Sequence, residues 1–320
     1  MYKAKERTKL MTSITELFDL KYPVFQGAMA QFSKHQLAAA VSNAGGLGII
    51  ASGGMSAEEL QTEIKACQKL TDRPFAVNLM LMAPNVPELV NIIIEEKVPI
   101  VTTGAGTPKK YMPQLKAAGI KVVPVVPSAK LAKKMEDLGV DAVVAEGSEA
   151  GGHIGELSTM VLVPQVVQAV NIPVIAAGGI ANGKGMAAAF ALGAQGIQMG
   201  TAFLLAEECP IPQNVKEFVA NAGELDTVVT GRKGVAPVRS IKNKMIDQYL
   251  QWEKEDIPFA QLEELTLGSA RKATSGDIEN GSVMAGQISG LVHEIEPAKE
   301  MIEGIVAEAN ETIKQLKTIV

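Results

Sequence analysis

Eight short apolar runs, rich in β-branched residues, recur about 20 to 32 residues apart along the first two thirds of the chain. None of these runs alternates between apolar and polar side chains, so none has a face suited to water. This pattern is typical of strands in a parallel sheet, which are covered on both faces. The predicted strands lie at residues 23–26, 47–51, 75–79, 100–103, 121–126, 142–145, 173–177 and 196–199.

The segments between the runs carry the signals of helix ends. Residues 56–59, Ser-Ala-Glu-Glu, match a capping box, and Ser33 and Ser128 are further candidates for N-caps. Eight strand–helix units predict the α/β class and a (β/α)8 TIM barrel. The alternative is a doubly wound open sheet, which does not need eight units. Glycines that end helices in a left-handed conformation are expected at Gly45, Gly119, Gly139 and Gly193.

The pattern changes after Met199. Residues 205–299 are mostly polar, show helical spacing and are interrupted by Pro and Gly, which predicts a small helical region that covers the substrate. Residues 298–316 have apolar positions near helical spacing and are expected to form a last helix that returns to the barrel wall. The predicted barrel therefore comprises residues 12–204 and 300–320.

The composition and charge of the chain argue against several classes of function. The 320 residues are 47% hydrophobic and 20% charged, which is ordinary for a globular protein. A net charge of −5 offers no basic surface for nucleic acid, and no apolar run approaches the roughly 20 residues that span a membrane. Two isolated cysteines, Cys67 and Cys209, suit a reducing cytoplasm. Residues 1–10 are basic without an apolar core, so we expect no secretory signal there, and Met11 is an alternative natural start.

Small residues predominate where the predicted strands end, and active sites of such barrels lie at those ends. Gly178 and Gly179 follow the seventh strand, and Gly200 and Thr201 follow the eighth. Bare backbone amides in these two loops can point at an anion, so the sequence predicts a phosphate site there. A purely structural role for these glycines in tight turns is the alternative.

Two nucleotide-binding motifs are excluded. Residues 178–184 have the spacing of a P-loop, but Gly185 stands where the metal-binding Ser or Thr is required. No Gly-x-Gly-x-x-Gly opens a strand–helix unit, which argues against a Rossmann dinucleotide site.

The sixth strand leads directly into Glu146-Gly-Ser-Glu-Ala-Gly-Gly-His153-Ile-Gly155. A carboxylate at the strand end is followed by glycines that leave room beside one imidazole. We expect His153 to serve as an acid or a hydrogen-bond donor toward a flat ligand. His35 and His293 lack such surroundings and are expected to be surface or core residues, and three scattered histidines predict no zinc site.

Nine segments together resemble the flavin-dependent enoyl-acyl-carrier-protein reductases of bacterial type II fatty-acid synthesis. These enzymes share a barrel superfamily with the nitronate monooxygenases. The Glu-Ala-Gly-Gly-His-x-Gly element at residues 149–155 is common to both groups, and the match on either side of it favours the reductases. The matching segments are 22–27, 41–50, 74–78, 101–106, 123–128, 145–155, 175–181, 198–201 and 281–291.

The resemblance implies one FMN across the carboxyl ends of the strands, with its phosphate in the two loops after the last strands. The implied FMN-binding residues are Gly27, Ala28, Met29, Asn78, Glu146, Gly152, Gly178, Gly179, Gln198, Met199, Gly200 and Thr201. Residues expected on the substrate side are Ser282, Met284 and Gln287.

The implied reaction passes hydride from NADH to FMN and then to the β-carbon of a trans-2-enoyl thioester on acyl carrier protein. The flavin carries the redox chemistry. His153 is expected to hydrogen-bond the thioester oxygen or to protonate the α-carbon, because an imidazole of pKa about 6.5 has both forms near neutral pH.

Two other functions stay open at this point. One is a nitronate monooxygenase that oxidises alkyl nitronates with FMN and oxygen, and the other is a phosphate-binding barrel with no redox role. The resemblance also implies a homodimer, and a monovalent cation held by backbone carbonyls would leave no signature in the sequence. A basic patch for the acidic acyl carrier protein is expected at Arg232 and Lys233 or at Lys242 and Lys244.

Overall fold

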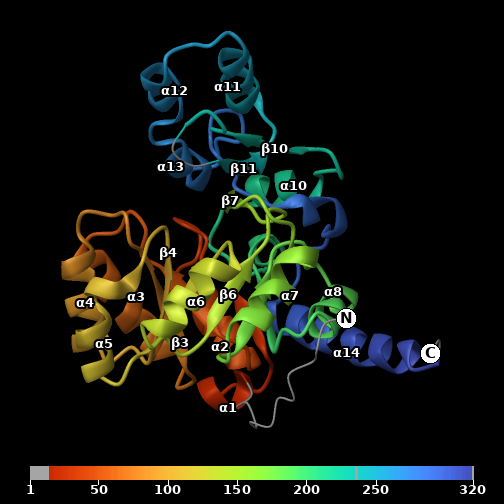
Figure 1. The fold of residues 1–320 in the computed structure, drawn as a ribbon. Helices are drawn as coiled ribbons and strands as arrows, with labels where there is room; N and C mark the ends of the chain where they lie inside the picture. Colours follow the sequence, from red (N-terminus) through yellow and green to blue (C-terminus); the bar gives the residue numbers. More distant parts are fainter. Residues whose placement is uncertain (1–13, 235–236, 319–320) are drawn as a thin grey trace.

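The computed structural model describes residues 14–234 and 237–318, so the basic segment at residues 1–10 lies outside the described residues. Eight parallel strands form a barrel with helices around it (Figure 1). The strand order is β1-β9-β8-β6-β5-β4-β3-β2, and a parallel bridge between Phe25 and Leu47 joins the two outermost strands. The predicted (β/α)8 TIM barrel is confirmed.

Each predicted strand is present, and its ends differ from the prediction by at most one residue. Successive residues within a strand enter different cores: Val143 packs outward against the helices, whereas Val144 packs inside the barrel. This double burial explains why the runs have no polar face. The barrel strands are β1 (Val24–Gln26), β2 (Gly48–Ala51), β3 (Phe75–Met80), β4 (Ile100–Gly104), β5 (Lys121–Val126), β6 (Val143–Glu146), β8 (Val174–Ala177) and β9 (Gly196–Met199).

The amino-terminal end of the barrel is closed by apolar packing. Helix α1 (Ile14–Phe18) buries both of its terminal residues, and the Phe18 ring meets the Phe25 ring edge to face, with centroids 5.6 Å apart. Such packing leaves the carboxyl ends of the strands as the open end of the barrel.

The helices around the barrel begin and end largely as predicted. Ser56 forms the expected capping box with Glu59, and Ser128 caps α6 by accepting from Leu131 N. Ser33 does not cap α2, because the helix begins at His35 and its N-cap position is Lys34. The Ser33 hydroxyl accepts from Met29 N instead. The helical segments are α2 (His35–Ala44), α3 (Ala57–Leu70), α4 (Val86–Glu95), η1 (Pro108–Lys110), α5 (Met112–Ala117), α6 (Ala129–Asp137), α7 (Thr159–Ala169), α8 (Gly183–Ala191) and α9 (Thr201–Leu204).

The last helix, α14 (Ala298–Leu316), packs against α8 and α2, as the sequence pattern predicted. Met301, Ile302 and Ile305 are buried in this contact, whereas Leu316 is 47% exposed where the helix extends beyond the barrel (Figure 1). Within the described part of the chain, no helix is both long and apolar enough to cross a membrane.

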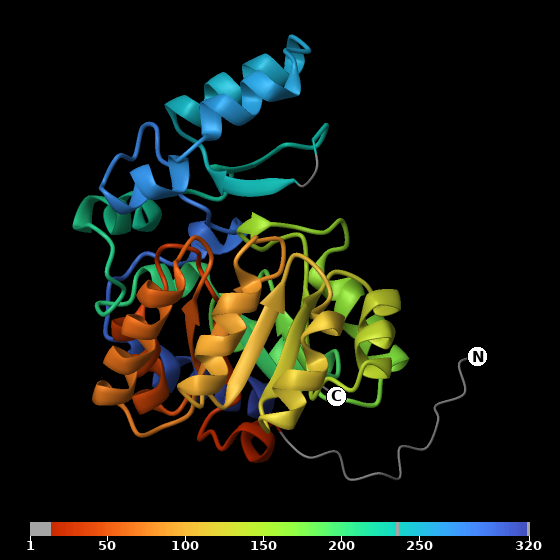
Figure 2. The same ribbon diagram turned by 90° about the vertical axis from the view of Figure 1, so that its left-hand side faces the viewer.

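The elements between α9 and α14 form a small domain over the carboxyl ends of the strands (Figure 2). The sequence pattern predicted mostly helices here, but the domain also contains a hairpin, β10 and β11. β11 pairs with β7 (Gly152–His153), a short strand from the loop after β6, to give the sheet order β10-β11-β7. The bounds are α10 (Gln213–Ala220), β10 (Thr227–Thr230), β11 (Val238–Ile241), α11 (Lys244–Lys254), α12 (Phe259–Thr266), α13 (Ser269–Thr274) and η2 (Gln287–Leu291).

Candidate active site

Two adjoining cavities lie at the carboxyl ends of the barrel strands, one of about 420 Å³ and one of about 80 Å³. The larger cavity extends from the barrel strands to Ala270 on α13 of the small domain. The smaller cavity lies over the ends of β8 and β9. Because several residues line both cavities, one ligand can occupy the two together. The shared residues are Ala28, Met29, Glu146, Gly151, Gln198 and Met284.

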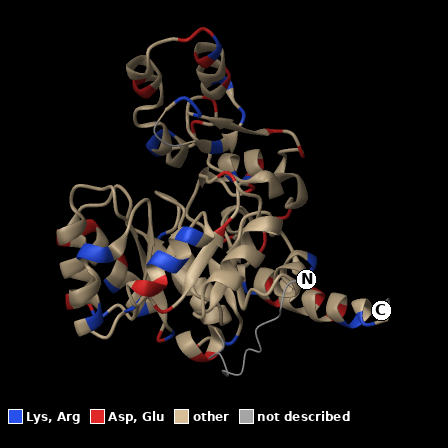
Figure 3. Cartoon of the chain, in the orientation of Figure 1, with Lys and Arg blue, Asp and Glu red and all other residues tan. Residues whose placement is uncertain are grey.

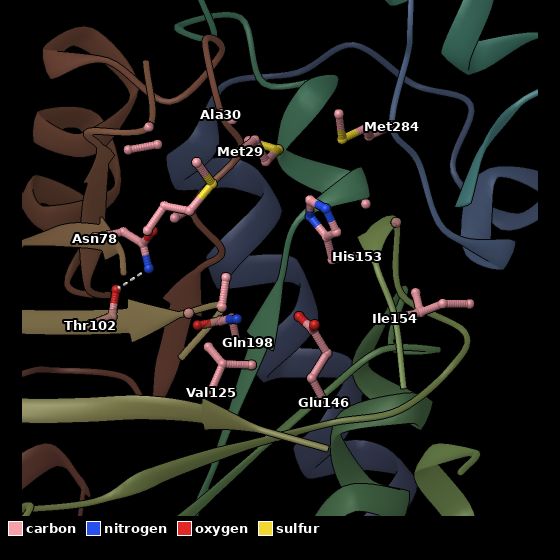
Figure 4. A pocket seen from close by; sticks show the side chains of 18 of the residues that line it. Met29, Ala30, Asn78, Thr102, Val125, Glu146, His153, Ile154, Gln198 and Met284 are labelled. Atoms are coloured by element: carbon pink, nitrogen blue, oxygen red, sulfur yellow. Dashed lines mark hydrogen bonds between the residues drawn. The ribbon is translucent and has the colours of Figure 1, made fainter. Parts of the chain in front are cut away.

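Polar side chains from separate strands border the larger cavity (Figure 4). The Asn78 amide nitrogen donates to Thr102 Oγ1 at 2.9 Å, which holds the amide in place. Gln198 is 7% exposed, and its side chain makes no hydrogen bond within the described residues. Buried polar groups normally have partners, so Gln198 is available to a ligand.

His153 stands on β7 and exposes its imidazole to the larger cavity. Neither ring nitrogen has a hydrogen-bond partner among the described residues, so both can face a ligand. The backbone of β7 is held by the small domain, since His153 pairs with Val238 and Gly152 with Arg239. Ile154 N extends this contact by donating to Pro237 O at 3.1 Å.

Arg239 holds the loop that precedes β7. Arg239 is 8% exposed, and its guanidinium donates to Ser148 O from Nε at 3.3 Å and from Nη2 at 3.2 Å. Nη1 donates to Thr227 Oγ1 on the neighbouring strand at 3.3 Å. The loop that carries His153 is therefore tied to the small domain through side chain and backbone alike.

Glu146 ends β6 and lines both cavities. Its carboxyl group has no hydrogen-bond partner in the described part of the chain, and burial raises its pKa from the ordinary 4.5 to about 7. The carboxyl group can therefore accept or donate a hydrogen bond near neutral pH.

Glycines, which expose their backbone, form much of the lining of the smaller cavity. Gly178 and Gly179 have φ of +87° and +73°, a conformation that favours glycine. A Cβ atom on Gly178 would also lie 2.8 Å from Gly147 O. These glycines are therefore needed for the shape of the loop. Because they have no side chains, backbone groups line the cavity beside Thr201, as a phosphate site requires.

Glu149, in the smaller cavity, was not singled out from the sequence, although it begins the Glu-Ala-Gly-Gly-His element. Its carboxylate accepts from Thr159 N at 2.9 and 3.0 Å and from Thr159 Oγ1 at 3.0 Å. The Arg239 charge also acts on it. These partners balance a negative charge close to the expected phosphate. Other lining residues that sequence reasoning missed are Ala150, Ala177, Ile180, Gly286 and Ile288.

The structure brings the predicted site residues together, with one exception. Gln287 lies outside the lining of both cavities with an exposed side chain, and its backbone N donates to Glu149 O at 2.9 Å. Ser282 and Met284, from the same segment, do line the larger cavity. The remaining predicted residues line one or both cavities: Gly27, Ala28, Met29, Asn78, Glu146, Gly152, His153, Gly178, Gly179, Gln198, Met199, Gly200 and Thr201.

The other histidines and the cysteines lie outside the two cavities. His35 Nδ1 is 2.7 Å from Glu63 Oε2 and joins α2 to α3, and His293 Nδ1 lies 2.8 Å from Ala220 O. Burial raises the pKa of the Cys67 and Cys209 thiols to about 12, so neither is a reactive thiolate. Within the described residues no cluster of His, Cys, Asp and Glu is arranged to hold a metal ion.

Comparison with known proteins gives matches along nearly the whole chain. A probable nitronate monooxygenase of Staphylococcus saprophyticus is 36% identical, over 96% of this chain and 100% of its own length. The (3aS,4S,5R,7aS)-5-hydroxy-7a-methyl-1-oxo-octahydro-1H-indene-4-carboxyl-CoA dehydrogenase of Rhodococcus jostii is 33% identical, over 96% of this chain and 98% of its own. Among solved structures, FabK from Thermotoga maritima shares 48% sequence identity, with a TM-score of 0.94 over 98% of this chain and 100% of that one.

The family model for nitronate monooxygenases matches residues 11–308. This match includes the barrel, the strand that carries His153 and the small domain. The chain therefore belongs to the nitronate monooxygenase family of oxidoreductases.

Proposed function

We propose that this protein reduces the carbon–carbon double bond of trans-2-enoyl thioesters on acyl carrier protein, with NADH as electron source and bound FMN as cofactor. The observation that carries the proposal is the larger cavity. It places an unpartnered imidazole, that of His153, beside mostly apolar walls that extend to α13 of the small domain. An acyl chain beside a proton donor needs such a slot.

The relatives support a thioester substrate. The resemblance in nine segments points to the flavin-dependent enoyl-acyl-carrier-protein reductases, and FabK matches this chain over its full length at 48% identity. The Rhodococcus jostii relative is named for a carboxyl-CoA substrate, which is also a thioester.

The residues of the site fit FMN. The backbone of Gly178, Gly179 and Gly200 can receive the phosphate, and Gln198 and Glu146 have free polar groups for the ring and the sugar chain. Bound FMN would supply the hydride acceptor and donor that this protein's side chains lack.

His153 provides the proton chemistry. Negative charge builds on the thioester oxygen as hydride reaches the β-carbon, and an N–H of His153 can hydrogen-bond that oxygen or protonate the α-carbon. Met29 and Met284 line the same cavity and exclude water, which strengthens a hydrogen bond to the developing charge.

A nitronate monooxygenase is the second candidate, favoured by the family model and by the Staphylococcus saprophyticus relative. In that reaction His153 would act as a base or orient a small nitronate. A small nitronate makes no use of the part of the cavity that reaches Ala270, so the extent of the cavity favours the reductase.

An anaerobic titration separates the candidates. The FMN-loaded protein is mixed with NADH, the visible flavin band is followed, and a trans-2-enoyl thioester is then added. We expect NADH to bleach the band and the thioester to restore it. Bleaching by an alkyl nitronate but not by NADH would assign the monooxygenase reaction. A colourless protein that cannot be loaded with FMN would contradict both and favour a non-redox phosphate site.

A further inference from the structure

One section of the barrel is unusually rich in lysine. Residues 97–135 contain eight lysines and neither Asp nor Glu, although the whole chain has 35 acidic and 30 basic residues. An uninterrupted basic stretch in an acidic protein creates a local positive field.

The topology places part of this stretch at the mouth of the larger cavity. β4 and β5 are neighbouring parallel strands, so the segments that follow them, η1 and α6, lie at the same end of the barrel. The loops that lead into these segments line the larger cavity through residues 104–106 and through Pro127, and α6 itself contributes Leu131. Lysines on η1 and in the first turn of α6 therefore stand beside a wall of the cavity, and Lys134 follows one turn further along α6.

Four of these lysines are exposed and take part in no ion pair within the described residues: Lys109, Lys110, Lys130 and Lys134, here called the rim lysines. Lys133, between two of them on α6, is instead paired with Glu136 and Asp137. Figure 3 marks lysine positions in blue on the ribbon of α6, on the outside of the barrel. The charges of the rim lysines are thus not neutralised by any ion pair within the described residues.

The basic residues expected from the sequence to face a carrier are largely neutralised by acids of the small domain. Lys242 Nζ lies 3.3 Å from Asp247, Lys244 Nζ lies 3.9 Å from Glu279, and Lys233 pairs with Asp256. These lysines offer less net charge to a partner than the rim lysines do.

We propose that the rim lysines are the docking surface for the acidic acyl carrier protein, whose prosthetic arm enters the larger cavity past residues 104–106 and Leu131. This inference rests on the proposed function and locates its macromolecular partner. Acidic groups of the carrier face four cations on two adjacent segments, and such complementarity mainly raises the association rate.

The spread of the rim lysines favours a protein partner over a nucleotide. They occupy two separate segments, and Lys130 and Lys134 are one helical turn apart on α6. They are exposed, whereas a diphosphate is usually held in a concave site of backbone amides. A broad acidic surface can engage all four.

The test combines the changes Lys109→Glu, Lys110→Glu, Lys130→Glu and Lys134→Glu in the FMN-loaded protein. Lys242→Glu with Lys244→Glu serves as the control on the small domain. Binding of fluorescently labelled trans-2-octenoyl-acyl carrier protein is measured by anisotropy at low salt, independently of turnover. Steady-state rates are measured with the same carrier thioester, with the uncharged N-acetylcysteamine thioester and with varied NADH.

We expect the fourfold variant to bind the carrier at least tenfold more weakly and to lose most of the salt dependence of binding. Its kcat/KM for the N-acetylcysteamine thioester and its KM for NADH should match the wild type. Unchanged carrier affinity, or an equal loss with both thioesters, would overturn the docking surface. A raised KM for NADH with normal carrier binding would assign the rim lysines to the nucleotide instead. Absence of wild-type turnover on either thioester would reject the proposed function, while the anisotropy still decides the docking.

Discussion

Val238 of the small domain lies opposite His153 in the antiparallel pairing of β11 with β7. The only histidine in the two cavities, among the residues that the structure describes, is therefore positioned by a strand more than 80 residues away in sequence. The small domain covers the site and also forms part of its framework. A change in this pairing should act on the reaction without touching the barrel.

Arg239 should be a positioning residue for His153. Arg239→Met removes the donors to Ser148 O and Thr227 Oγ1, and we expect kcat to fall about tenfold, because one or two buried hydrogen bonds contribute on the order of 1–2 kcal/mol. Arg239→Lys should restore part of the rate. Arg232→Met, at an exposed neighbouring position, is the matched control. A wild-type kcat in Arg239→Met would show that the β-pairing alone positions His153.

His153→Ala should keep FMN and lose activity. Removal of a general acid typically costs about 10²- to 10⁴-fold in rate, and the imidazole makes no hydrogen bond to the described protein residues that binding of FMN would need. Turnover and the flavin content of the purified variant are the two measurements. His293→Ala, outside both cavities, should behave as the wild type. A nearly normal rate in His153→Ala would remove this residue from the mechanism.

Glu146 should make the stability of the FMN-free protein depend on pH. Its pKa is about 7 when folded and about 4.5 when unfolded, so the folded state binds more protons between these values. The free energy of unfolding should therefore fall as pH rises from about 4.5 to 7, by roughly 1–3 kcal/mol. Urea unfolding at pH 5 and pH 8 measures this change in the free energy of unfolding.

Glu146→Gln should abolish that part of the pH dependence, and Asp72→Asn at an exposed position should leave it intact. If both variants keep the wild-type difference between pH 5 and pH 8, then another group causes it.

Gly200→Ala should weaken FMN binding without unfolding the chain. The added Cβ atom would meet only Met29, at 3.8 Å or more, which is ordinary contact, and the backbone φ of −105° suits alanine. We expect the Tm of the FMN-free variant to stay within about 2 °C of the wild type. The Kd for FMN should rise about tenfold, because the methyl group occupies space beside the expected phosphate.

Fluorescence titration with FMN measures this Kd. Gly304→Ala on α14, where a Cβ atom meets nothing within 4 Å, is the control and should bind FMN normally. Equal affinities in the two variants would move the phosphate away from Gly200.

Much of the barrel could be predicted because its signals are local. Each strand is an apolar run of three to six residues that is buried on both faces, and the capping box and the glycines at helix ends depend on neighbours within one turn. The candidate site followed from the same information. Once eight parallel strands are placed, their carboxyl ends must meet, and Asn78, Glu146 and Gln198 come together without any long-range knowledge.

The hairpin of β10 and β11 was not predicted, because its short strands lie among polar residues and β11 pairs with β7, which is distant in sequence, as well as with β10. The ion pairs of Lys233 with Asp256 and of Lys244 with Glu279 were not predicted for the same reason, since charges in contact need not be near in sequence. The position of the Gln287 side chain was also not predictable from the sequence. Gln287 belongs to a segment that matches the reductases, yet its side chain is exposed to solvent.

The sequence by itself determined the repeated strand–helix order, the glycine-rich strand ends and the presence of one histidine among them, because each of these is a property of a few adjacent residues. Only the tertiary structure decided how the histidine is held, how far the cavity extends and which lysines stay unpaired. Those features depend on contacts between the barrel and the small domain, whose partners are set by packing and burial rather than by spacing along the chain.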